Sequence, residues 1–197
     1  MAEIKSTLDL VLERAERMAQ TATNDLSQDN THKKGMQLAA QFMDNTLDSL
    51  IDALNELPPD QQIPLRQGMV AVLLRNIFLP RDASARERTD KAINGILNLA
   101  GGTGEMASIC EEIRHITGQY HQHREQLKEQ LEEQVRVQYE QLLAQQAGGM
   151  QQNQGMSPEM ALQAKIKEEW SRLETELSDQ YSQALDQHKT TVQERLG

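Results

Sequence analysis

Cysteine, proline and aromatic residues are all scarce in this sequence. Its 197 residues include one Cys, five Pro, one Trp, three Tyr and two Phe. A single cysteine, Cys110, excludes an intrachain disulfide and a cysteine-based zinc site. It lies at an apolar position of "MASICEEIRHI", so we interpret it as a small core residue of a protein in the reducing cytoplasm. A core this poor in aromatic residues must be built from Leu, Ile, Val, Ala and Met, which favours helices.

An excess of positive charge and a long hydrophobic run are also missing. The formal net charge is -10, and no stretch of clustered Lys and Arg interrupts the acidic bias. We therefore expect neither nucleic acid nor a membrane as a partner. The longest apolar stretch, "GMVAVLLRNIFLP", contains Arg75 and is too short to span a bilayer. The first residues, "MAEIKSTLDLVLERAERM", carry acidic residues within their apolar pattern, so we do not expect a signal peptide.

The first hundred residues show helical periodicity with several interruptions. Apolar residues at three- and four-residue steps predict one helix before "NDLSQDN" (24–30) and a second from about 36 to 54, ended by "ELPPDQQ". A third helix, at about 60–79, is apolar nearly all round and should lie at the centre of the core. A fourth begins at Asp82 or Ser84 as N-cap and ends with Gly101 at the C′ position. The predicted core residues of this bundle are Met69, Val70, Leu73, Leu74, Ile77 and Phe78.

The second half of the chain has two long helical patterns. They cover about 103–147 and 158–196, and "GGMQQNQGMSPEM" (148–160) separates them. Ser157 is suited to be an N-cap, with Pro158 in the first turn. A connection of about ten residues allows the two helices to fold back antiparallel, with the tip at 148–157. A flexible linker and a dedicated binding loop are the two other readings of this stretch.

Apolar residues in these two helices recur every eleven residues. Trp170, Tyr181 and Val192 show this spacing, as do Tyr120 and Leu131. A period of eleven corresponds to 3.67 residues per turn, which predicts nearly straight helices or a slight right-handed supercoil. The residues predicted to form the seam are Tyr120, Leu127, Leu131, Val135, Leu142, Leu162, Ile166, Trp170, Leu173, Leu177, Tyr181 and Leu185.

These patterns predict an all-α protein. Residues 1–100 form an N-terminal bundle of about four helices, and residues 101–197 form a long antiparallel coiled-coil hairpin. An isolated two-helix hairpin buries one stripe of each helix, so we expect further helices from other copies of the chain. The sequence thus favours a non-enzymatic, self-associating structural or scaffold protein, a homo-oligomer for which a closed ring is one form. An adaptor or chaperone-like module that binds another protein through the hairpin is the alternative, and a di-metal helical-bundle enzyme is a remote one.

The motifs that carry chemistry are few. Glu112 and His115 have the spacing used in di-iron bundles, but such a site needs two of these motifs. Asp29 and His32 have the same spacing, with Asp where the motif has Glu. His121 and His123 are two residues apart and do not share a helix face. "AGGTGE" (100–105) lacks the Lys and Ser/Thr of a phosphate-binding loop. We therefore predict no catalytic residue, no metal site and no cofactor.

Glutamines form a ladder along the first long helix, at three- and four-residue steps. One interpretation is a solvated helix surface, and the other is a seam between subunits joined by amide hydrogen bonds. The members are Gln119, Gln122, Gln126, Gln130, Gln134, Gln138, Gln141 and Gln145.

The stretch "EIKSTLDLVLERAERM" (3–18) resembles the start of a family of short bacterial all-helical proteins of unassigned function. This resemblance implies a bacterial, cytoplasmic protein and brings no activity or site residues. The two long helices are similar in pattern to the peripheral-stalk helices of rotary ATPases, which also show eleven-residue periods. The chain lacks the mixed α/β domain that caps that stalk subunit.

Overall fold

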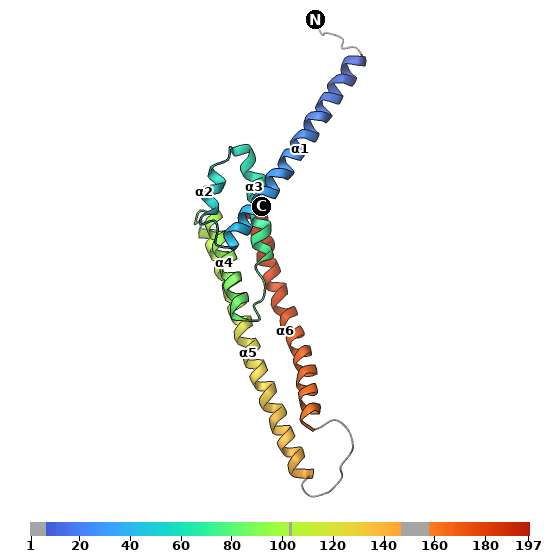
Figure 1. Ribbon diagram of the computed structural model, residues 1–197, viewed down its shortest axis with the longest axis vertical. Coiled ribbons are helices and arrows are strands. Elements are labelled where there is room, and N and C mark those ends of the chain that lie inside the picture. Colours follow the sequence, from blue (N-terminus) through green and yellow to red (C-terminus); the bar gives the residue numbers. More distant parts are fainter. Residues whose placement is uncertain (1–6, 103, 147–157) are drawn as a thin grey trace.

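The computed structural model describes the backbone of residues 7–102, 104–146 and 158–197. Across these residues the protein is all-α, with no strand. The helices are α1 (Thr7–Met43), α2 (Leu50–Asn55), α3 (Pro59–Arg75), α4 (Ala83–Leu99), α5 (Gly104–Gln146) and α6 (Pro158–Leu196). The first part of α1 extends away from the other helices, and α5 and α6 run together in the opposite direction (Figure 1).

α1 is one helix where the sequence predicted two. The break predicted at 24–30 is wrong, because α1 continues through these residues. None of them is Gly or Pro, and Asn, Asp and Ser cost a helix only a fraction of a kcal/mol each, about 0.5. The Thr31 hydroxyl also donates to the Ser27 carbonyl oxygen at 2.9 Å, so its polar group is satisfied within the helix.

The helix predicted for 36–54 is interrupted in the structure. α1 ends at Met43, and Asn45 takes a left-handed conformation with φ of 60°. The Thr46 N–H and hydroxyl both donate to the Gln41 carbonyl oxygen at 2.9 Å, so the last turn of α1 is capped. A new short helix, α2, then begins after Ser49, whose side chain accepts from the Asp52 N–H.

α1 and α3 cross with their backbones in contact. A Cβ atom added to Gly35 would overlap the Leu65 carbonyl oxygen, and one added to Gly68 would overlap the His32 carbonyl oxygen. Each helix thus presents a glycine where the other helix comes closest. This crossing fixes the second half of α1 against the helix at the centre of the core, and the helical periodicity of the sequence did not predict it.

α3 lies at the centre of the core, as predicted, but ends earlier than expected. Met69, Val70 and Leu73 are fully buried and Leu74 is nearly so. The helix stops at Arg75, and the chain continues without helical structure as far as Asp82. We call residues 76–82 the connecting segment.

Phe78 is not a core residue, contrary to the prediction. Because α3 ends at Arg75, the helical period no longer decides which side chains of residues 77 and 78 face the core. Ile77 enters the core with 1% exposure, whereas Phe78 is 38% exposed.

The core includes residues from both halves of the chain. Met106, Cys110 and Ile113 of α5 and Leu185 and Val192 of α6 belong to the same buried cluster as the core residues of α3 and α4. The division predicted at residue 100 therefore runs through a shared core.

The predicted ends of α4 agree with the structure. The Asp82 side chain accepts from the Ala85 N–H at 2.8 Å, and Gly101 follows the helix with φ of 60°. Near its end, the Asn98 side-chain oxygen accepts from the N–H groups of Leu50 and Ile51 at 2.8 and 3.0 Å. Asn98 thus caps α2 from a distant part of the chain.

Candidate interaction surface on the helical arm

The feature that distinguishes this fold is a projecting pair of helices. Beyond the core, α5 and α6 lie side by side and run in opposite directions (Figure 1). We call residues 121–146 of α5 with residues 158–184 of α6 the arm. The predicted tip at 148–157 lies outside the described residues.

The predicted seam residues of α5 and α6 are buried to different depths. Tyr120, Leu131, Val135, Leu177 and Leu185 are buried. Half-buried positions are Leu127, Leu162, Ile166, Trp170, Leu173 and Tyr181. Leu142 lies in α5, but its side chain is outside the described residues. The seam is therefore deepest near the core and shallower on α6 toward the free end of the arm.

A hydrogen-bonded aromatic cluster closes the seam where the arm leaves the core. The Tyr120 and Tyr181 rings pack edge to face, with centroids 5.6 Å apart. The Tyr120 hydroxyl lies 3.1 Å from Ser178 Oγ, and the Tyr181 hydroxyl lies 2.6 Å from His123 Nδ1. Burial raises the pKa of Tyr181. The eleven-residue spacing predicted both tyrosines but not their partners Ser178 and His123, because polar residues carry no signal in the apolar period.

An ion pair next to this cluster connects the arm to the connecting segment. Arg124 Nε donates to Glu174 Oε1 at 3.0 Å, and both side chains are less than a fifth exposed. Arg124 Nη1 also donates to the Arg81 carbonyl oxygen at 3.3 Å, and the guanidinium lies 5.3 Å from the centre of the Trp170 ring. One arginine therefore holds both arm helices and the segment between α3 and α4.

The junction between core and arm contains a small cavity of about 220 Å³. Phe78 and Arg81 of the connecting segment and Asp186 and Lys189 of α6 are among the residues that line it. Lys189 Nζ donates to the Ile77 carbonyl oxygen at 3.1 Å. The charged residues of the lining are thus two cations and one carboxylate.

The candidate metal ligands from the sequence do not converge in the structure. Glu112, His115 and His123 are all exposed on α5. Within the described part of the chain, no group of three or more His, Cys, Asp and Glu side chains has an arrangement that could hold a metal ion. The surface with the most regular chemistry lies elsewhere on α5.

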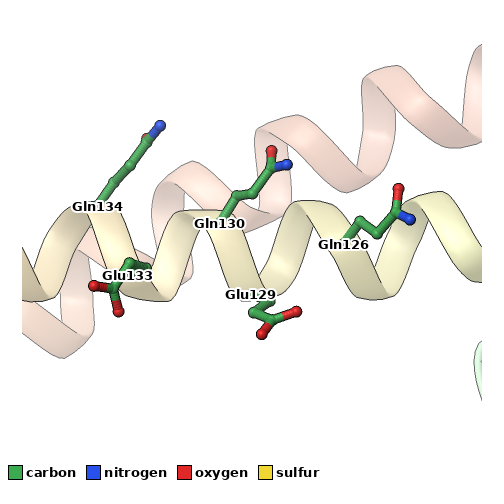
Figure 2. Close-up of a pocket in the computed structure, with 5 residues that line it drawn as sticks. All are labelled: Gln126, Glu129, Gln130, Glu133 and Gln134. Carbon is green, nitrogen blue, oxygen red and sulfur yellow. The ribbon is translucent and has the colours of Figure 1, made fainter.

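That surface is the glutamine ladder, which stays exposed along the arm. Figure 2 shows Gln126, Gln130 and Gln134 on one side of α5, with Glu129 and Glu133 turned to the other side. These five residues border a shallow depression of about 430 Å³. We call the exposed glutamines from 119 to 141 the amide face; they are Gln119, Gln122, Gln126, Gln130, Gln134, Gln138 and Gln141. The side chain of Gln145 is outside the described residues.

These features define an all-α protein: the six helices described share one core, and α5 and α6 continue beyond it as the arm. Among the helices described, none has both the length and the hydropathy that a membrane crossing requires. The chain belongs to a family of unknown function (DUF6657), whose match covers residues 51–194. The matched region runs from the second residue of α2 almost to the end of α6 and so contains most of the core and the whole arm. No curated protein and no solved structure matches the chain.

Proposed function

We propose that this protein is a non-enzymatic, self-associating structural or scaffold protein that works as a homo-oligomer in the bacterial cytoplasm. The observation that carries the proposal is the arm itself. Its two helices bury one stripe against each other, and their outer faces stay exposed along the arm. A projecting surface of this length, which no other part of the described chain covers, is suited to contact between molecules.

Energetics supports the same conclusion. Each fully buried aliphatic side chain contributes about 1.5–3 kcal/mol, but several α6 seam residues, including Ile166 and Leu173, are half-buried. Ordering each backbone residue costs about 1–2 kcal/mol. The outer part of a two-helix pair is thus only marginally stable alone, and helices from other copies would bury its sides. We propose an eleven-residue coiled-coil register for the arm and a closed oligomer, of which a ring is one form.

The alternative is an adaptor or chaperone-like module whose partner is a different protein. The exposed Phe78 beside the junction cavity favours it, because an exposed aromatic ring next to a depression is a typical anchor point for a partner.

Mass measurement of the full chain under native conditions separates the two functions. We expect a discrete multimer in native mass spectrometry, because the arm would be covered by other copies. A monomer at every concentration would overturn the scaffold proposal and favour the adaptor.

A further inference from the structure

The spacing of the amide face is symmetric about its centre. From Gln119 to Gln141 the steps between successive glutamines are 3, 4, 4, 4, 4 and 3, and the middle residue is Gln130. Reading the helix backward from Gln141 therefore gives the same pattern as reading it forward from Gln119. When two such helices pack antiparallel around Gln130, every glutamine meets a glutamine.

The chemistry of this face suits a second copy of the same chain. A glutamine amide carries two donors and one acceptor oxygen, so amides can pair with amides. The chain has a net charge of -10, and two copies repel over most of their surface. The amide face offers a strip of uncharged side chains, which adds no repulsion of its own between copies. Glu129 and Glu133 border the same depression from the other side of α5 (Figure 2).

An exposed apolar residue lies on the same strip. Val137 is seven residues after Gln130, and His123 is seven before it; two helical turns return a side chain to nearly the same face. Val137 is 40% exposed. In an antiparallel pair centred on Gln130, each Val137 would pack against the His123 ring of the other copy, which Tyr181 holds in place.

The contact area depends on α6 as well as on the strip. From Gln119 to Gln141 the strip is about 33 Å long, and the two-helix arm that carries it is about 20 Å wide, so a partner that covers both helices would bury about 660 Å² per copy. α6 borders the strip, since Lys165 Nζ lies 3.5 Å from Gln138 Oε1. A standard interface buries about 800 Å² per partner.

We propose that two copies of this chain pair through their amide faces, antiparallel, around a two-fold axis at Gln130. This inference rests on the proposed self-association and specifies the surface that performs it. The contact is isologous, so it closes on itself as a dimer, and a larger ring would need a second contact elsewhere.

Engineered cysteines test the position of the axis in the full chain. A Gln130→Cys variant should form a disulfide-linked dimer under mild oxidation, because the two cysteines face each other across the axis. Gln126→Cys alone should not, whereas Gln126→Cys with Gln134→Cys should. Gln37→Cys, at an exposed position of α1, is the matched control, and the native Cys110 is buried. Cross-linking at 130 no faster than at 37 would overturn the proposed axis.

Added charge tests the contact without a covalent bond. The double variant Gln130→Glu, Gln134→Glu places like charges opposite the partner's strip, and its dimer should dissociate roughly tenfold or more easily. The control, Gln28→Glu with Gln37→Glu, adds the same charge to exposed positions of α1 and should leave the dimer intact. If the wild type is an oligomer and the Gln130→Glu, Gln134→Glu variant stays equally associated, this inference alone is refuted. A wild-type monomer would refute the scaffold function as well.

Discussion

At the scale of single residues, two glycines decide how closely the first helix approaches the core. Gly35 and Gly68 bring the backbones of α1 and α3 into contact, and a side chain at either position would meet a carbonyl oxygen rather than a flexible group. Backbone cannot move aside as a side-chain tip can, so the helices would have to separate.

We predict that Gly35→Ala and Gly68→Ala each lower the free energy of unfolding by about 1–3 kcal/mol, the usual cost of overpacking. Gly118→Ala is the matched control, since Gly118 lies within α5 and a Cβ added there meets no other part of the chain within 4 Å. That change should raise stability by about 0.5–1 kcal/mol, because alanine favours the helix. Urea unfolding monitored by circular dichroism measures all three, and destabilisation no greater at 35 and 68 than at 118 would contradict the close crossing.

Cys110 should make stability depend on pH in the alkaline range. Burial raises the pKa of its thiol from 9.0 to about 11. The unfolded chain therefore loses this proton first as the pH rises, and the free energy of unfolding falls between about pH 9 and pH 11. Below pH 9 the thiol contributes no pH dependence. Thermal unfolding across this range should give a shallower decline for Cys110→Ala than for wild type, and equal slopes would show that the thiol is accessible to water.

At the scale of elements, Arg124 joins three parts of the chain that are distant in sequence. It pairs with Glu174 of α6 and donates to the Arg81 carbonyl oxygen in the connecting segment. Removing one partner of a shielded ion pair leaves the other charge poorly solvated.

We predict that Glu174→Gln destabilises the protein by about 1–3 kcal/mol, the cost of leaving a shielded charged group without its partner. Glu169→Gln is the control, because Glu169 pairs with Arg172 on the exposed surface of α6, where ion pairs contribute about 0–1 kcal/mol. Chemical unfolding of both variants gives the comparison. Equal effects would mean that Arg124 does not fasten the arm to the connecting segment.

The ends of helices could be predicted where local capping residues determine them. They could not be predicted where a contact with a distant part of the chain determines them. Asp82, Gly101 and Pro158 mark helix ends through local capping, and the structure has helix ends at these positions. The break at 24–30 was inferred from polar composition, which lowers helix propensity too little to end a long helix. Phe78 was placed in the core because the helical period was extended past Asn76, where α3 has already ended.

At the scale of the whole molecule, the sequence indicated an all-α fold with two long helices but not how the halves meet. The periodicity of α5 and α6 predicted a shared seam. It carried no signal that Leu185 and Val192 would return to the core beside Met106 and Ile113. Such contacts depend on the direction in which the chain folds back, and hydrophobic spacing within one helix does not encode that direction. The spacing of the glutamines in the sequence predicted the amide face. The fold was needed to show that these side chains are exposed.

The distance between copies, measured by electron paramagnetic resonance with spin labels on the arm, tests the central claim most directly. In the proposed antiparallel pair, labels at a Gln130→Cys variant lie close together across the two-fold axis. Labels at a Gln141→Cys variant are about 33 Å apart, since 22 residues separate Gln141 from the Gln119 that it faces. Equal short distances at both positions would indicate parallel arms. The absence of any intermolecular distance would contradict self-association through the arm.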